Sequence, residues 1–253
     1  MTDTINSLRA WLDEEPANVI ADISPNDNMH ARNRRWYDRA GQLAVKQVRL
    51  AMLAAGRDRL DSILDFGCGH GRVLRTLKAG FPQASLTACD INRDGVDFCA
   101  QAFGATPAYS STDPAEISID DRFDLIWCNS FFTHVDREGW DRFLPFLESL
   151  LSKDGIFIFT TAGRRAVQKL RDQPSRWMLR WMLREDIRAG FLEDYARDGF
   201  AHRDSPNSTG WGYTAASPAW VCGRIQAVTD LRLLGVAETK NIDTFSCMRA
   251  GGQ

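Results

Sequence analysis

The sequence lacks the marks of several protein classes. Its six cysteines include no C-x-x-C pair and several lie in apolar runs, so we expect buried, reduced thiols in a cytoplasmic protein rather than a disulfide framework. The four histidines are scattered and show no metal-ligand spacing. There is no apolar run of about 18 residues, the length that predicts a membrane span. The first 30 residues are polar and include no apolar core, which argues against a signal peptide.

Length and composition are those of an ordinary globular protein. The 253 residues suit one large domain, or one core domain with appendages, and 44% of them are hydrophobic and 25% charged. A chain of this length buries about three quarters of its unfolded surface, so it needs no disulfide or metal to fold. The net charge of −2 gives no reason to expect nucleic acid or an anionic membrane as a partner.

Strand-like and helix-like segments alternate through much of the chain. Residues 1–30 are polar and predict a loosely held arm with one short helix near 7–14, and a helix is predicted over 31–56. The predicted strands that follow are 62–66, 85–90, 106–110, 123–129 and 155–161. Three helices are predicted between them: one that follows the first strand and ends near residue 79, one over 92–103 and one over 139–152. This alternation predicts an α/β fold with a doubly wound, mostly parallel sheet.

Two more strands, 231–237 and 241–248, follow a predicted helix over 218–229. Their short connection predicts a hairpin, so we expect a seven-stranded sheet with one antiparallel edge strand. The expected organisation is an N-terminal arm and helix in residues 1–56 and a main domain in residues 57–253. A helical insert, residues 164–213, interrupts that domain after the fifth strand.

A glycine-rich loop, Asp65-Phe-Gly-Cys-Gly-His-Gly71, joins the first predicted strand to a helix. Glycines let a backbone turn tightly and approach a ligand closely. Asp90, nineteen residues beyond Gly71, is placed at a strand end where it can accept hydrogen bonds from two ribose hydroxyls. Pyrophosphate-binding loops usually read G-x-G-x-x-G, whereas this loop reads G-x-G-x-G, and Asp65 would repel a pyrophosphate. The pattern favours S-adenosylmethionine, which carries an ammonium and a sulfonium but no phosphate.

Four segments together resemble the class I (Rossmann-like) S-adenosylmethionine-dependent methyltransferases of the small-molecule type. These are D-F-G-C-G-H-G-R-V-L, C-D-I-N, F-D-L-I-W-C-N-S-F-F-T-H-V and L-L-S-K-D-G-I-F-I-F-T-T, within residues 34–162. The resemblance implies S-adenosylmethionine as cofactor, with its methionine moiety on the glycine loop. The cofactor-binding residues that it implies are Asp65, Gly67, Cys68, Gly69, Gly71, Asp90, Ile91, Asp113, Asn129 and Ser130. Asp113, expected at the adenine, lies in the poorest match, and the alternative is an ordinary exposed aspartate before a proline turn.

The segment after the fourth predicted strand, Asn129-Ser-Phe-Phe-Thr-His134, faces the transferred methyl group in this family. It lacks the Pro-Pro-aromatic sequence of enzymes that methylate bases and glutamine amides. It also lacks the aspartate that binds magnesium in catechol-type enzymes, so we expect metal-independent chemistry. His134 is the candidate catalytic base, because its pKa range suits proton removal at neutral pH. The alternative is a histidine that caps or packs the next helix.

The insert is basic and aromatic. Residues 164–203 hold ten Arg and Lys against six Asp and Glu, and R-W-M-L-R-W-M-L-R at 176–184 predicts a helix with its arginines on one ridge. That helix would pack on the core, cover the acceptor with arginines reaching an anionic group, or contact a membrane surface or subunit. Because a long aromatic segment after the fifth strand is placed beside the acceptor, we expect an ordered, partly helical lid.

The expected function is methyl transfer from S-adenosylmethionine to a hydroxyl or amine of a small molecule. Residues 210–220 are rich in glycine and aromatics and resemble a segment of glycan-pathway methyltransferases, so a sugar or glycan is one candidate acceptor and an anionic compound is another. The sequence is compatible with a monomer and with a homo-oligomer. Two other functions compete: a non-catalytic protein that binds S-adenosylmethionine, and a nicotinamide-dependent oxidoreductase. The loop spacing and Asp65 count against the oxidoreductase.

Overall fold

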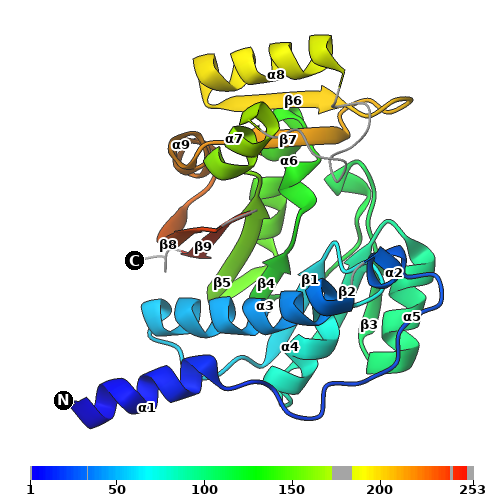
Figure 1. Ribbon diagram of the computed structural model, residues 1–253. Coiled ribbons are helices and arrows are strands. Elements are labelled where there is room, and N and C mark those ends of the chain that lie inside the picture. Colours follow the sequence, from blue (N-terminus) through cyan, green and yellow to red (C-terminus); the bar gives the residue numbers. More distant parts are fainter. Residues whose placement is uncertain (1, 33, 173–183, 240–241, 250–253) are drawn as a thin grey trace. The chain divides into compact units, whose positions relative to one another are not determined.

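The computed structural model describes residues 2–32, 34–172, 184–239 and 242–249. Its main element is a seven-stranded sheet in the order β3-β2-β1-β4-β5-β9-β8, and β6 and β7 form a separate two-stranded sheet (Figure 1). The strands are β1 (Ser62–Phe66), β2 (Ser85–Asp90), β3 (Thr106–Tyr109), β4 (Phe123–Cys128), β5 (Leu151–Thr161), β6 (Phe200–Asp204), β7 (Gly212–Ala216), β8 (Leu231–Glu238) and β9 (Asp243–Arg249).

Strand pairing confirms the predicted α/β fold. β1 lies parallel between β2 and β4, and β2 is parallel to β3. β8 and β9 form the predicted antiparallel hairpin, so the edge strand β8 runs against its neighbour. The later strand of the hairpin, β9, lies beside β5, while the earlier strand takes the edge.

Helices connect these strands. They are α1 (Thr2–Asp13), α2 (Asn28–Arg32), α3 (Arg34–Ala55), α4 (Leu74–Gly80), α5 (Arg93–Phe103), α6 (Arg137–Ser149), α7 (Arg164–Asp172), α8 (Glu185–Asp198) and α9 (Pro218–Val228), with short 3-10 turns at Pro114–Glu116 and Phe131–Thr133. The predicted end of one helix was wrong: α6 stops at Ser149 and β5 begins at Leu151. Leu150 and Leu151 are buried, and the Leu150 carbonyl accepts a hydrogen bond from the Phe123 N–H (2.8 Å), so these residues belong to the sheet.

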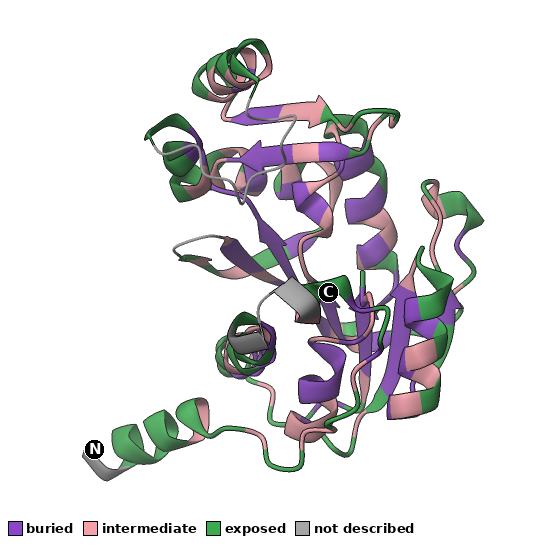
Figure 2. Cartoon of the chain, turned by 45° about the vertical axis from the view of Figure 1, so that its right-hand side comes forward, coloured by how far each residue is buried: buried purple, intermediate pink, exposed green. Residues whose placement is uncertain are grey.

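The chain forms two compact units. The first consists of Met1–Trp127 and Leu150–Ile156, and the second of Cys128–Ser149 and Phe157–Gln253. In the first unit most residues of β1 and β2 are buried, and buried segments are purple in Figure 2. Strands buried on both faces need nearly continuous apolar runs, which is why S-I-L-D-F and S-L-T-A-C-D were recognisable.

The N-terminal arm of the first unit makes hydrogen bonds with residues of α3. The Arg49 guanidinium donates to the carbonyls of Trp11 (2.7 Å) and Glu14 (2.6 Å), and the Tyr37 hydroxyl donates to Asp27 (2.7 Å). These hydrogen bonds link parts of the arm to α3, and the predicted looseness of the arm stays a prediction.

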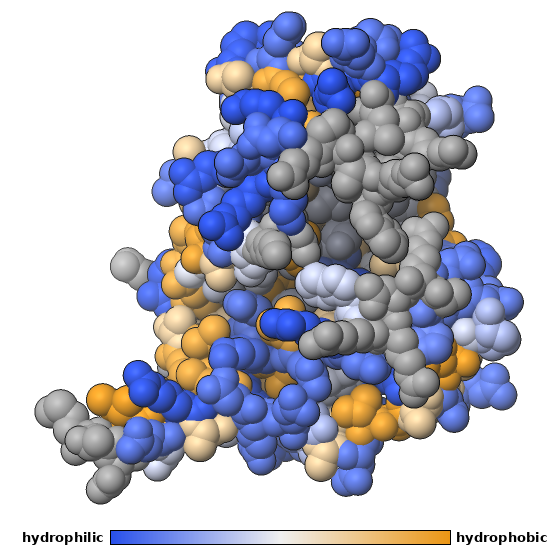
Figure 3. Space-filling model, viewed as in Figure 1, coloured by the Kyte–Doolittle hydropathy of each residue, from blue (hydrophilic) through white to orange (hydrophobic). Residues whose placement is uncertain are grey.

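One face of α1 and α3 stays apolar and exposed. Figure 3 shows hydrophobic atoms on the surface in the region of these two helices. The exposed side chains are Ile5, Leu8, Leu43, Leu50 and Leu53. They explain why helical spacing in this segment extends beyond the residues that the core buries.

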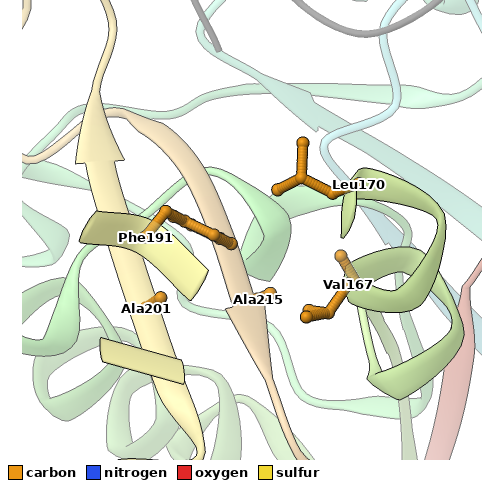
Figure 4. Packing of buried hydrophobic residues seen from close by; sticks show 6 residues of the cluster. Val167, Leu170, Phe191, Ala201 and Ala215 are labelled. Carbon is orange, nitrogen blue, oxygen red and sulfur yellow. The ribbon is translucent and has the colours of Figure 1, made fainter. Parts of the chain in front are cut away.

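The insert contains strands that the sequence did not predict. β6 and β7 pair antiparallel over five residues each, between α8 and α9. They carry the insert's own hydrophobic core, in which Val167 and Leu170 of α7 and Phe191 of α8 pack on Ala201 and Ala215 (Figure 4). Within the predicted insert, residues 164–172 and 184–213 are described and form α7, α8, β6 and the start of β7, whereas most of the Arg/Trp repeat at 176–184 lies outside the described residues.

Candidate functional site

The glycine loop of the first unit follows β1 and is tied to the end of β2. The N–H groups of Gly67 (2.8 Å) and Cys68 (3.1 Å) both donate to the carbonyl of Cys89. Gly67, Gly69 and Gly71 all have positive φ, at 82°, 53° and 76°, which side chains rarely adopt. The loop thus needs glycine at the three predicted positions.

Asp90, at the end of β2, is joined directly to the glycine loop. Its Oδ2 accepts a hydrogen bond from the Gly69 N–H (2.8 Å), and its Oδ1 accepts one from the Asn92 N–H (2.8 Å). A carboxylate has about four lone-pair sites, so Asp90 retains acceptor capacity for ligand hydroxyls. The structure therefore brings together the two elements that the sequence predicts for a nucleoside.

Asp65 is the buried acid of this loop. It is 1% exposed, and its Oδ2 has no hydrogen-bond partner in the part of the chain that the structure describes. Burial, with the nearby charge of Asp90, raises the pKa of Asp65 to about 7. A buried acceptor without a partner is costly, and an ammonium ligand would both supply a partner and stabilise the charge.

Three other predicted cofactor residues lie in the first unit. Cys68 is buried, and its thiol pKa is raised by a hydrogen bond with Cys99 and by burial, so it packs as a neutral side chain. Ile91 is 59% exposed directly after β2, where an apolar side chain is available to a ligand. The carboxylate of Asp113 caps the short helical turn after it by accepting from the Ala115 N–H (3.0 Å). The adenine contact predicted for Asp113 stays a prediction.

Sequence reasoning missed two features of this loop. Gly95 of α5 lies against it: a Cβ at Gly95 would be 2.4 Å from the carbonyl oxygen of Gly69. His70 contacts Asp94 (2.9 Å), which also accepts from Asn26 of the N-terminal arm (3.0 Å). The N-cap Asn92 signals the start of α5, but no local pattern places that helix or the arm on the loop.

Asn129 and Ser130 belong to the second unit, after β4. Ser130 has φ 64°, its N–H donates to the Thr160 hydroxyl (2.7 Å), and that hydroxyl donates to Asn129 Oδ1 (3.1 Å). The positive φ is unusual for serine and is fixed by this link to β5. Hydrogen bonds to Thr160, near the end of β5, hold these two residues in place. Their predicted contact with the cofactor stays a prediction.

The protonation of His134 follows from its partner. Its Nδ1 lies 2.8 Å from the carbonyl oxygen of Gly212, which only accepts hydrogen bonds, so Nδ1 carries the proton. The neutral ring then keeps its lone pair on Nε2, for which no partner exists among the described residues. Burial lowers the pKa of His134 from its ordinary value, which favours this neutral form at pH 7. The ring has the form that a general base requires.

The insert packs along the segment that contains His134. The Gly212 N–H donates to the His134 carbonyl (2.7 Å), and the Thr214 hydroxyl donates to the Val135 carbonyl (2.6 Å). Trp211 stacks on the His134 ring, with centroids 4.9 Å apart and planes at 21°, and stays 41% exposed. Within the second unit, β7 therefore covers the residues that follow β4.

Three described arginines of the insert form ion pairs with acidic residues of the protein. Arg164 pairs with Glu238, Arg184 with Asp186, and Arg203 with Asp194 (2.7 Å). Exposed pairs of this kind contribute about 0–1 kcal/mol each and leave these side chains oriented toward acids of the protein. These three arginines give no support to the predicted anionic-acceptor site.

Two kinds of feature are absent from the described residues. These residues hold no group of three or more His, Cys, Asp or Glu side chains that could bind a metal ion. Among them, no helix is both long and apolar enough to cross a membrane. All six cysteines are free thiols, as predicted.

Comparison with known proteins adds to this geometry. A family model described as a methyltransferase domain matches residues 64–157. A malonyl-[acyl-carrier protein] O-methyltransferase of Acetivibrio thermocellus is 29% identical over 147 residues, which are 56% of this chain and 51% of that enzyme. A fatty-acid O-methyltransferase of Mycolicibacterium smegmatis is 30% identical over 105 residues, 41% of this chain and 38% of that enzyme. The chain thus matches about half or less of the length of these curated relatives.

A solved structure shows the same fold over nearly the whole chain. It is an S-adenosylmethionine-dependent methyltransferase from Clostridium acetobutylicum, with a TM-score of 0.59 and 15% identity, covering 88% of this chain and 100% of that one. Residues 64–157 therefore match a methyltransferase domain, and the chain shares the fold of an S-adenosylmethionine-dependent methyltransferase.

Proposed function

We propose that the protein binds S-adenosylmethionine and transfers its methyl group to an oxygen of a small-molecule acceptor. The observation that carries the proposal is the loop of the first unit. It has three glycines with positive φ, a hydrogen bond from the Gly69 N–H to Asp90, and a buried Asp65 whose Oδ2 has no partner among the described residues. When bound, S-adenosylmethionine supplies a methyl group already activated by its sulfonium. Asp65 would hold the ammonium, and Asp90 would hold the ribose hydroxyls.

The same loop argues against a nicotinamide dinucleotide. A pyrophosphate brings negative charge, and Asp65 and Asp90 are both carboxylates of this loop region. Bringing an anion next to buried like charge is costly because the interior screens it weakly. A zwitterionic, phosphate-free nucleoside avoids that cost.

The first prediction concerns ligand choice. S-adenosylhomocysteine at about 100 times its dissociation constant should stabilise the protein by about 2.7 kcal/mol. For a protein of this size that corresponds to a rise in melting temperature of about 5–10 °C. NAD at the same concentration should give no rise. Differential scanning fluorimetry measures both, and a protein that NAD stabilises but S-adenosylhomocysteine does not would contradict the proposal.

A carboxylic acid is the acceptor that the curated relatives favour. Their names describe O-methylation of a malonyl group and of a fatty acid. A carboxylate is already ionised at neutral pH, so methyl transfer to it needs alignment of donor and acceptor rather than a base. The protein would then contribute mainly by holding the acceptor oxygen in place and excluding water.

A hydroxyl or amine acceptor is the second candidate, and His134 is the observation that favours it. Its Nε2 lone pair is available because Nδ1 donates to Gly212. Such an acceptor must lose a proton during transfer, and a positioned base contributes about 10²–10⁴-fold to that step. The sugar or glycan acceptor stays a prediction that no relative's name supports.

The second prediction separates these acceptors. With a carboxylate acceptor, His134→Gln should lower kcat less than tenfold, and kcat should stay flat between pH 6 and 8. With a hydroxyl acceptor, the kcat of the variant should fall about 10²–10⁴-fold. The wild-type rate would then fall as the pH drops through the lowered pKa of His134, since the protonated ring cannot act as a base. Steady-state rates with panels of acids and alcohols test this, and turnover of neither panel would favour a non-catalytic binding protein.

A further inference from the structure

His202 of β6, in the second unit, is held at both nitrogens of its ring. The side chain is 13% exposed. Nδ1 lies 2.7 Å from the hydroxyl oxygen of Thr214, the residue opposite His202 in the β6–β7 pair. Nε2 lies 3.0 Å from Oδ1 of Asp204, two residues further along β6. Both contacts are within hydrogen-bond distance, so they decide which ring nitrogens carry protons.

The partners of His202 fix its protonation. The Thr214 hydroxyl has one hydrogen, which it donates to the Val135 carbonyl (2.6 Å), so its oxygen must accept from His202 Nδ1. The Asp204 carboxylate only accepts, and its Oδ1 already accepts from the Gly210 N–H (2.8 Å). Nε2 must then also carry a proton, because two lone pairs facing each other at 3.0 Å would repel. With both nitrogens protonated, the His202 ring is an imidazolium.

The charged groups around His202 favour this cation. On the same strand, Arg203 donates to the His202 carbonyl (2.7 Å) and pairs with Asp194 of α8 (2.7 Å). His202 also lines a cleft together with residues of α6 and α8. Acidic side chains outnumber arginines in this cleft, which favours a positive charge on the ring. Its other charged residues are Asp136, Arg137, Glu138, Asp141, Arg197 and Asp198.

His202 is connected to His134 through β7. Thr214, which accepts from His202, holds the carbonyl of Val135, the residue after His134. Two residues before Thr214, Gly212 accepts from His134 Nδ1 and donates to the His134 carbonyl. Burial, and to a smaller extent the charge of His202, lowers the pKa of His134. The two rings therefore belong to one hydrogen-bond network and have opposite protonation states.

We propose that His202 is a positioning residue: as an imidazolium bonded to Asp204 and Thr214, it fixes the segment that contains His134 and keeps the His134 ring neutral. The inference rests on the proposed function in its form with a hydroxyl or amine acceptor, because only such an acceptor needs a base. Two titratable groups whose surroundings favour opposite charge states are the arrangement that acid–base catalysis uses. His134 would meet the acceptor, and His202 would act only through β7 and through its charge.

Nitrogen-15 NMR of the histidine rings tests the protonation states without acceptor or cofactor. As the pH rises through the range in which histidines titrate, His134 should lose its second ring proton before His202 does, and neutral His134 should keep its proton on Nδ1. In His202→Gln, which keeps a donor for Thr214 but no charge, His134 should hold its second proton to a higher pH than in the wild type. His202→Lys keeps a positive charge and should restore part of the difference.

Arg197→Gln is the matched control. It removes a cation from the same cleft, but one that is exposed and paired with Asp194 and Asp198, so the titration of His134 should not change.

Steady-state rates with a hydroxyl acceptor test the consequence for catalysis. His202→Gln should lower kcat severalfold at pH 6 and less than about twofold at pH 8, where His134 is neutral in both proteins. A merely structural role would lower kcat by the same factor at both pH values. His202→Lys should recover part of the rate at pH 6.

Several results would overturn the inference. In the wild type, His202 could lose its second proton at a lower pH than His134. In the variants, His202→Gln could leave the His134 titration unchanged, or Arg197→Gln could shift it equally. Turnover of acids alone would also overturn it, because His134 would then remove no proton from the acceptor.

The wild-type spectra decide the first point even if the His202 variants fail to fold. Asp204→Asn then takes their place: without the neighbouring anion, His202 should lose its second proton at a lower pH, and His134 should keep its own to a higher pH. A protein that turns over neither acids nor alcohols is a separate result, because it refutes the proposed function while the spectra still decide the protonation states.

Discussion

Replacing Asp90 with alanine should weaken the binding of S-adenosylhomocysteine about a hundredfold or more. Two hydrogen bonds from ribose hydroxyls to a carboxylate contribute roughly 1.5–3 kcal/mol each, and both would be lost. Asp90 also holds the N–H groups of Gly69 and Asn92, so the variant leaves the glycine loop less ordered before the ligand arrives. The loss of pre-organisation acts in the same direction as the loss of contacts.

Calorimetric titration checks this prediction, with Asp97→Ala as the control. Asp97 is an exposed acid of α5 that accepts from the Tyr109 hydroxyl (2.6 Å), so its removal changes the charge of the same unit by the same amount. Asp90→Asn should fall between wild type and Asp90→Ala, since it keeps the shape but loses the charge. An unchanged dissociation constant in Asp90→Ala would show that the nucleoside does not lie on this strand end.

The cofactor half of the site was predictable because its pattern is local. Asp65, the three glycines and Asp90 lie at the ends of two adjacent parallel strands, and the apolar runs of those strands fix their ends in the sequence. A glycine loop between a strand and a helix leaves few alternative conformations. Nearly all of the residues proposed to contact the nucleoside could therefore be predicted from the sequence alone.

Contacts between distant residues were not predictable in the same way. Asn26 and Asp94 are 68 residues apart, and nothing near either one indicates that the arm reaches the loop. Gly95 is a second example. A side chain at this position would clash with the carbonyl of Gly69, which lies 26 positions earlier in the chain.

The β6–β7 hairpin shows a further limit. Its strands, F-A-H-R-D and G-Y-T-A-A, are five residues long and carry few large apolar side chains. Their stability comes from α7 and α8 packing on one side and from the hydrogen bonds to residues 134–135. Periodicity identifies strands with several large apolar side chains, and these two strands have few of them.

Replacing Trp211 with alanine should lower kcat/KM for the acceptor about 10- to 100-fold while the affinity for S-adenosylhomocysteine stays within a fewfold. The Trp211 ring stacks on His134 and lies 6.0 Å from Phe131, so its loss changes the surface beside the candidate base. Because Trp211 is 41% exposed, its loss should destabilise the protein less than the loss of a fully buried aromatic ring. Trp211→Phe should recover most of the rate, since it retains an aromatic face.

Tyr213 of β7, two residues beyond Trp211, is the contrasting variant. It packs on Phe191 (ring centroids 5.5 Å apart) in the insert's hydrophobic core, and burial raises the pKa of its hydroxyl to about 12. Tyr213→Ala should therefore destabilise the protein by about 3–5 kcal/mol, as loss of a buried aromatic ring does. Thermal melts and steady-state kinetics on both variants separate the roles. If Trp211→Ala keeps full kcat/KM, or if it loses stability as Tyr213→Ala does, the insert is a structural element rather than a cover for the acceptor.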